Sequence, residues 1–185
     1  VTQYVMEDLA RVPVRVELAS EFRYRNPILQ PTDLVIVVSQ SGETADTLAA
    51  LRLAKEKGVR TLGIVNVVGS SIAREADNVM YTWAGPEIAV ATTKAYSTQL
   101  IAQYLLAMKF AKVRGTVSQN DFDAMIQSLE RLPEQISLLL SHKENVQRFA
   151  NRYLAAEHVF FIGRGIDYAI SMEGSLKLKE ISYIH

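Results

Sequence analysis

The sequence predicts an α/β fold in which a doubly wound parallel sheet is covered by helices on both faces. The run LVIVV, residues 34–38, is continuously apolar, as expected of a strand that is buried on both faces. Strand-like and helix-like patterns alternate along the chain, and this alternation is typical of parallel sheets. The chain has 185 residues, of which 49% are hydrophobic, so it is long enough to bury a core.

Hydrophobic periodicity gives the predicted elements in chain order. A helix is expected over residues 2–12, and a strand over residues 14–18, where apolar side chains alternate with polar ones. The strand within residues 33–39 is followed by a helix over 44–57, which Gly58 is expected to stop. The further predicted elements are a strand over 61–66, a short helix over 71–76, a strand over 79–83, helices over 93–113, 119–140 and 143–155, a strand within 158–165 and a helix from Tyr168.

The predicted elements suggest two domains. Four strands precede the long helices, one fewer than in a usual five-stranded doubly wound domain. We therefore expect residues 1–142 to form a first domain that lacks its initial strand. Residues 143–185 are expected to hold a linker helix and the first strand and helix of a second domain. One strand and one helix cannot bury a sheet, so both ends of the chain are expected to be cut.

Composition argues against several classes of protein and site. The 20 acidic and 20 basic residues cancel, which argues against a nucleic-acid partner. The chain has no cysteine, so it holds no disulfide, thiolate metal site or cysteine nucleophile, and we expect neither a metal nor a cofactor. No apolar run approaches the ~18 residues of a membrane helix, so we expect no membrane partner and a cytoplasmic location.

The loop SQSGET, residues 39–44, follows the buried strand and opens the next helix. In an open parallel sheet, ligands bind at the carboxyl ends of strands, where helix N-termini attract anions. Gly42 allows a close backbone approach, and the hydroxyls of Ser39, Ser41 and Thr44 are potential donors. The loop lacks the lysine of a nucleotide-binding loop, so a small phosphorylated ligand is favoured. The alternative is an ordinary helix cap by Ser41 or Thr44.

A second loop of similar chemistry, Ala91-Thr92-Thr93-Lys94, opens the long helix predicted from residue 93. Thr92 or Thr93 is a candidate for a ligand contact. One hydroxyl is also all that a simple helix cap requires, so both alternatives stay open here.

These segments show a resemblance to a known family. SQSGETADTL resembles the phosphosugar-binding loop of sugar isomerase (SIS) domains, which have a flavodoxin-like, three-layer αβα fold. The resemblance extends, in the same order and over nearly the whole chain, to the family of glutamine–fructose-6-phosphate aminotransferases. The segments that narrow it are ASEFRYR (19–25), EIAVATTKAYSTQL (87–100) and GSLKLKEISYIH (174–185).

The resemblance implies a substrate and partners. Members of that family convert fructose 6-phosphate and glutamine-derived ammonia to glucosamine 6-phosphate. They carry a glutaminase domain and two SIS domains in one chain, and this chain would belong to their isomerase region. The family also suggests a homodimer with the sugar site near the interface.

The resemblance also implies roles for particular residues. The residues expected to hold the phosphosugar are Ser39, Gln40, Ser41, Gly42 and Thr44. Val90 and Thr92 are expected to line the sugar. Lys177 and Glu180 would form the catalytic pair, with Glu180 moving the proton between C1 and C2. Their spacing places them on one helix face, and without the resemblance a surface ion pair would be the favoured interpretation. His185 is a further possible site residue.

The resemblance implies that some parts of the family's site lie outside this sequence. A G-[TS]-S loop would precede Val1, and a ring-opening histidine and a C-terminal lysine would follow His185. The chain alone is therefore expected to be inactive. Two other functions remain as alternatives: a non-catalytic SIS module that binds a phosphosugar as a regulatory signal, and a stand-alone phosphosugar isomerase or deglycase.

Overall fold

A computed structural model describes residues 1–89 and 91–184 of the chain. The chain divides into two compact units. One unit is formed by Pro13–Ala107 together with Thr2, and the other joins Val1 and Gln3–Val12 to the chain from Met108 onward. The predicted boundary between residues 142 and 143 separates two expected domains, and it stays a prediction.

The first unit contains a sheet of three parallel strands in the order β1-β2-β3. The strands are β1 (Leu34–Ser39), β2 (Arg60–Val65) and β3 (Asn78–Tyr81). In the register, Val37 lies opposite Gly63, and Ile64 lies opposite Met80. All three strands therefore end at the same edge of the sheet.

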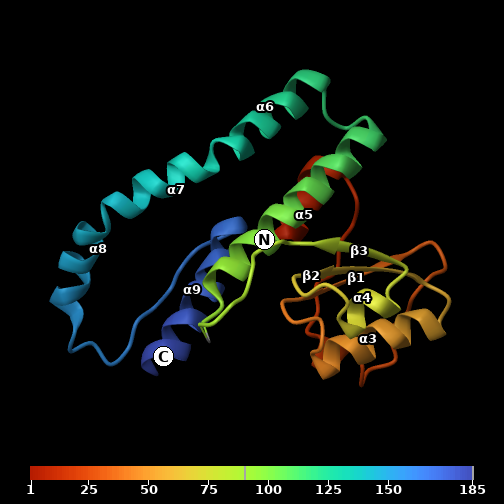
Figure 1. Ribbon diagram of the computed structural model, residues 1–185, viewed down its shortest axis with the longest axis horizontal. Helices are drawn as coiled ribbons and strands as arrows, with labels where there is room; N and C mark the ends of the chain where they lie inside the picture. The colour runs from red at the N-terminus through yellow and green to blue at the C-terminus, as the bar shows by residue number, and fades with distance from the viewer. Residues whose placement is uncertain (90, 185) are drawn as a thin grey trace. The chain divides into compact units, whose positions relative to one another are not determined.

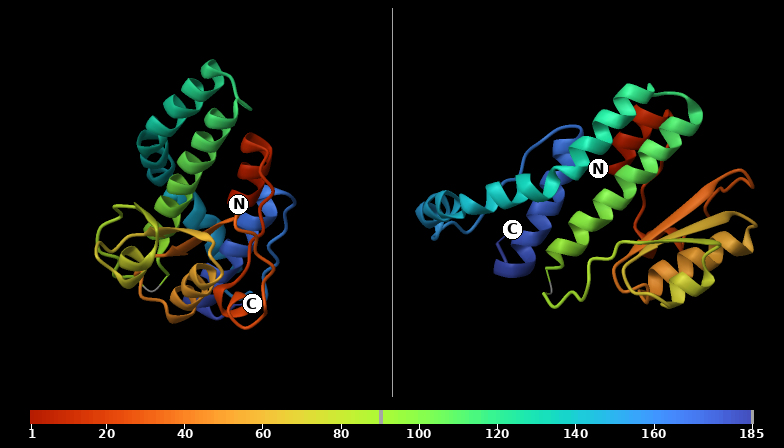
Figure 2. Two further views of the ribbon diagram at one scale, coloured as in Figure 1. Left: turned by 90° about the vertical axis from the view of Figure 1, so that its right-hand side faces the viewer. Right: turned by 45° about the horizontal axis from the view of Figure 1, so that its top comes forward.

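Helices cover both faces of this sheet (Figures 1 and 2). Helices α3 (Ala45–Glu56) and α4 (Ser71–Glu75) lie on one face, and the first part of α5 (Thr93–Arg114) lies on the other. Two apolar layers result from the alternation of side chains along the strands. One layer is formed by Val37, Leu51, Val65 and Ile72, and the other by Leu62, Ile64 and Ala102. The predicted doubly wound parallel arrangement is confirmed.

Helix α3 ends as its sequence predicts. Gly58 adopts a left-handed backbone conformation with φ of 72° just after the helix. Its N–H donates to the carbonyl of Lys55 at 2.9 Å, and the N–H of Val59 donates to the carbonyl of Ala54 at 3.0 Å. These two bonds form a Schellman motif, which satisfies the last carbonyl groups of the helix.

Two predicted strands are absent from the described chain. Residues 14–18 form neither helix nor strand, and Val16 is 68% exposed. Residues 158–165 also form no strand, and Phe160 and Ile162 are 91% and 88% exposed. Both segments have strand-like side chains, but neither pairs with the three-stranded ladder. A strand needs a hydrogen-bonding neighbour as well as a suitable pattern.

The other predicted helices are present with different ends or divisions, and a short helix over Ala19–Phe22 is not among the predicted elements. The predicted helix over 119–140 is two helices, because Pro133 lies in the first turn of the second and cannot donate a backbone hydrogen bond. The remaining helical elements are α1 (Thr2–Val5), a π-helix (Met6–Ala10), α2 (Ala19–Phe22), α6 (Gln119–Glu130), α7 (Leu132–Ser141), α8 (Lys143–Ala150), a 3₁₀ turn (Asn151–Tyr153) and α9 (Ile166–Ser182). None of the helices in the described ranges is long and apolar enough to cross a membrane.

Candidate functional site

The loop between β1 and α3, residues 39–44, is held together by its own hydroxyl groups. Ser39 is buried, and its Oγ accepts the N–H of Gly42 at 3.1 Å. The same oxygen lies 3.0 Å from Oγ1 of Thr44, so these two predicted site residues meet across the loop. Ser41 is exposed, and its Oγ accepts the N–H of Glu43 at 3.2 Å. The hydroxyls therefore shape the loop around the beginning of α3.

Position 42 must be a glycine in this conformation. Gly42 has φ of 66°, in the left-handed region that favours glycine. A Cβ atom at this position would lie 2.1 Å from Oγ of Ser70, which no real contact allows. Ser70 is buried, and among the described residues its Oγ has no hydrogen-bond partner. The loop after β1 therefore packs closely on the loop after β2.

The start of α3 is open. Thr44 occupies the N-cap position with extended backbone, but among the described residues no side-chain hydrogen bond caps the helix. The alternative of an ordinary side-chain cap by Ser41 or Thr44 is therefore not what the structure shows. A helix N-terminus whose N–H groups lack a side-chain acceptor is a suitable site for an anion.

An open pocket of about 460 Å³ lies at the carboxyl ends of all three strands. Its lining residues are Gln40, Asn66, Val67, Trp83, Gly85, Pro86 and Glu87. Gln40 follows β1, Asn66 follows β2, and Trp83 comes shortly after β3. The predicted site residue Gln40 thus faces a pocket of the size that small ligands occupy.

Asn66 joins the three strand ends and is not among the residues that the sequence predicts for the site. Its N–H donates to the carbonyl of Gln40 at 3.1 Å. Its Nδ2 donates to the carbonyl of Gly85 at 2.8 Å, and its Oδ1 accepts the N–H of Ala84 at 2.8 Å. The sequence feature that could have indicated this role is a polar amide side chain directly after the buried strand β2. Asn66 therefore fixes the pocket edge through bonds to both neighbouring loops.

The second predicted loop begins α5. Thr92 has a left-handed backbone conformation with φ of 54°. Its carbonyl accepts the N–H of Tyr96 at 3.2 Å, and its own N–H donates to the carbonyl of Ala89 at 3.1 Å. Thr92 therefore stands at the entry to α5 in a tight turn. Val90, the other residue predicted to line a sugar, lies outside the described residues.

The predicted catalytic pair lies on α9, in the other compact unit. Nζ of Lys177 donates to Oε2 of Glu180 at 2.7 Å and lies 3.5 Å from Oε1 of Glu173. The hydrogen bond to Glu180 is the main cause that raises the pKa of Lys177 above its ordinary value. The carboxylates of Glu180 and Glu173 keep the ammonium group of Lys177 charged, whereas its partial burial acts in the opposite direction. His185, the further possible site residue, lies outside the described residues.

Comparison with known proteins identifies relatives of this chain. A family model described as "SIS domain" matches residues 1–109. A curated protein of Caldanaerobacter subterraneus subsp. tengcongensis, named glutamine–fructose-6-phosphate aminotransferase (isomerizing), is 61% identical over 185 residues. A protein of the same name from Clostridium tetani is 55% identical over 185 residues. The chain spans 30% of the length of each of these relatives.

A solved structure has the same fold over the whole chain. It is the C-terminal domain of glucosamine-fructose-6-phosphate aminotransferase from Francisella tularensis. The two structures superpose with a TM-score of 0.96 at 40% sequence identity, over 100% of this chain and 52% of that chain.

Proposed function

Because the chain belongs to the SIS-domain family, we propose that it is the sugar-phosphate isomerase region of an aminotransferase. The reaction would convert fructose 6-phosphate and glutamine-derived ammonia to glucosamine 6-phosphate, as the names of the relatives suggest. The observation that carries this proposal is the uncapped start of α3, which opens beside a loop that contains three hydroxyl groups.

This geometry suits the phosphate of the substrate. The helix N-terminus supplies positive partial charge and N–H donors, and both favour an anion. Ser41 and Thr44 are exposed and can turn their hydroxyl hydrogens to phosphate oxygens, with Gln40 at the adjoining pocket. Thr92 and Val90 are proposed to line the sugar itself. Because Gly42 has no side chain, the loop backbone can pack against Ser70, and we propose that it can also lie close to the phosphate.

Titration calorimetry with fructose 6-phosphate tests the phosphate site. A Ser41→Ala, Thr44→Ala double variant should bind about 10²-fold more weakly, because a hydrogen bond to a charged group contributes roughly 1.5–3 kcal/mol. Fructose without its phosphate is the ligand control and should bind neither protein measurably. Equal affinity of the wild-type chain and the double variant for fructose 6-phosphate would remove the phosphate assignment.

We further propose that Glu180 carries the proton between C1 and C2 of the sugar and that Lys177 holds its carboxylate. The bond of 2.7 Å between the two side chains supports this pairing. A carboxylate so fixed is a suitable general base, since base catalysis requires a fixed group within hydrogen-bonding reach. The alternative is a surface ion pair, which would contribute only about 0.2–0.5 kcal/mol of stability.

The variant Glu180→Gln distinguishes a general base from a surface ion pair. It is tested in a protein that contains this chain and has the full length of the relatives. Glutamine keeps the size of the side chain but cannot accept the proton. Solvent hydrogen exchange at C1 or C2 of the bound sugar should slow by about 10²–10⁴-fold, with nearly unchanged phosphate affinity. Wild-type exchange in the variant would show that another group carries the proton. Sugar binding without exchange in the wild type would instead favour a non-catalytic phosphosugar-binding module.

The family resemblance of the sequence also suggests which domains and subunits accompany this region. We infer a glutaminase domain as partner in a longer chain and a homodimer as the assembly. The absence of cysteine fits a reducing compartment, and we propose the cytoplasm as the location.

A further inference from the structure

An acidic residue lies inside the loop that is proposed to bind an anion. Glu43 stands between Gly42 and Thr44, beside the open start of α3. A carboxylate directed at a bound phosphate would repel it, because like charges at short range raise the free energy of binding. The position of this side chain therefore matters for the proposed site.

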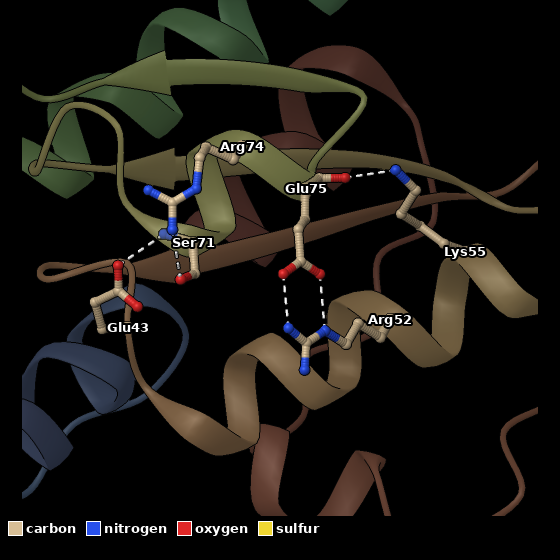
Figure 3. Close-up of polar contacts among 6 residues, drawn as sticks. All are labelled: Glu43, Arg52, Lys55, Ser71, Arg74 and Glu75. Carbon is tan, nitrogen blue, oxygen red and sulfur yellow. Dashed lines mark hydrogen bonds and ion pairs between the residues drawn. The ribbon is translucent and has the colours of Figure 1, made fainter.

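The carboxylate of Glu43 is bound to the start of a different helix, α4. Its Oε1 accepts the N–H of Ser71 at 2.7 Å (Figure 3). A backbone bond runs alongside, from the N–H of Ile72 to the carbonyl of Gly42 at 3.0 Å. Arg74 lies on the same side and donates to Oγ of Ser71 at 3.1 Å. Glu43 thus directs its charge to the N-terminus of α4, where negative charge is favourable.

Glu43 takes the place of a local cap on α4. Ser70 occupies the N-cap position of this helix, but its side chain makes no capping bond and its Oγ is buried against Gly42. The hydrogen bonds from Ser71 lower the pKa of Glu43, so its carboxylate stays ionised near neutral pH. An acceptor from one loop therefore completes the helix that starts in the next loop.

The opposite end of α4 is tied to α3. Arg52 donates to both carboxylate oxygens of Glu75, at 2.8 Å and 2.6 Å. Lys55 donates to the carbonyl of Glu75 (Figure 3). Helix α4 is therefore attached to the β1–α3 segment at both of its ends. Only the attachment at the N-terminal end of α4, through Glu43 and the carbonyl of Gly42, involves the loop at residues 39–44.

We propose that Glu43 is a positioning residue for the phosphate loop. Its bond to the N–H of Ser71 holds residues 39–44 in the binding conformation and keeps the negative charge directed to α4. The phosphate part of this inference rests on the proposed function, whereas the effect on the loop itself does not depend on any ligand.

Two substitutions remove the bond from opposite sides. Glu43→Ala removes the acceptor, and Ser71→Pro removes the N–H donor together with the serine hydroxyl. Proline is favoured at the first position of a helix, and Ser70 already has the extended backbone, with φ of −61° and ψ of 164°, that precedes proline. Ser71→Ala controls for the lost hydroxyl, because it keeps the N–H. Arg52→Ala is the matched control, because it breaks the attachment at the other end of α4.

Affinity for fructose 6-phosphate and for inorganic phosphate is measured for each chain. Glu43→Ala and Ser71→Pro should each weaken binding about tenfold, and together they should weaken it no further, since both break one bond. Glu43→Gln keeps an acceptor oxygen and should recover most of the affinity. Ser71→Ala and Arg52→Ala should stay within about twofold of the wild type. Unchanged or tighter binding by Glu43→Ala and Ser71→Pro would overturn the proposal.

Amide hydrogen exchange without ligand separates this inference from the phosphate site. Exchange at Gly42 and Ile72 should become faster in Glu43→Ala and Ser71→Pro but not in Arg52→Ala. If the wild type binds no phosphate, the proposed function fails, and the exchange rates still decide whether Glu43 holds the loop. Unchanged exchange at both amides would show that it does not.

Discussion

Helices α3 and α6 both start after a hydroxyl-bearing residue, yet their N-termini differ. At α6, Oγ of Ser118 accepts the N–H of Asp121 at 3.1 Å and donates to its carboxylate at 2.7 Å. At α3, Oγ1 of Thr44 lies 3.0 Å from Oγ of Ser39, and no side chain among the described residues caps the helix. The start of α6 is satisfied by its own first turn, whereas that of α3 is open to a ligand.

The difference shows how a helix cap can be distinguished from a loop that is proposed to bind a ligand. A cap needs one acceptor for the N–H groups of the first turn. At α3 the hydroxyls form hydrogen bonds with one another and with the loop backbone. The first N–H groups of the helix therefore remain available to donate to a ligand. Changes at the start of α3 should therefore alter ligand affinity, whereas changes at the start of α6 should alter stability.

The largest effect is expected when the loop before α3 is displaced. Gly42→Ala forces a Cβ atom into Ser70, so affinity for fructose 6-phosphate should fall by at least about tenfold. Gly58→Ala is the matched control, because Gly58 also has positive φ, at 72°, but nothing lies within 4 Å of the added Cβ. It should cost about 1–2 kcal/mol of folding free energy and leave affinity unchanged. Equal affinity of both variants would contradict the close packing described for Gly42.

The next effect separates the two helix starts directly. Ser118→Ala should lower the free energy of unfolding by about 1 kcal/mol, because it removes the cap of α6, and should not change phosphate affinity. Thr44→Ala should do the reverse, with weaker binding and a smaller loss of stability. Urea unfolding and calorimetry on both variants provide the measurement. A loss of stability in Thr44→Ala that matches Ser118→Ala would mean that Thr44 caps α3 after all.

The smallest effect concerns a carboxylate away from the loop. Asp77 accepts both the N–H and the hydroxyl of Thr61, at 2.8 Å each, and these bonds lower its pKa, with a further contribution from Lys55. A lowered pKa in the folded state adds stability that is present at neutral pH and is lost as pH falls below about 4. Urea unfolding between pH 6 and pH 2.5 should therefore show a shallower acid dependence for Asp77→Asn than for the wild type. Parallel curves would contradict this assignment.

The arrangement of the sheet and its helices follows from local pattern. The LVIVV run becomes β1 because helices cover both of its faces, and α3 begins and ends within a residue of the predicted positions. The family and the fold inferred from SQSGETADTL are confirmed by the match to the SIS domain and by the superposition with the Francisella structure. These features depend on neighbours in sequence, so the sequence alone predicts them.

Features that depend on distant partners could not be predicted. Residues 14–18 and 158–165 have the pattern of strands, but pattern does not show whether a ladder is available to pair with. Glu43 lies in a recognisable motif, but its partner Ser71 is 28 residues away. Asn66 bonds to Gly85, 19 residues further along the chain. Such contacts exist only after the loops are brought to one edge of the sheet.

Helix α4 also bears on the order in which the molecule folds. Five residues are too few to nucleate a stable helix in isolation. Its attachments come from Glu43, Arg52 and Lys55, so α4 can become stable only after β1 and α3 have come together with β2. We expect these contacts to form after the main barrier to folding, in which case their loss should accelerate unfolding more than it slows refolding. The conformation of the loop at residues 39–44 is therefore expected to be completed late in folding.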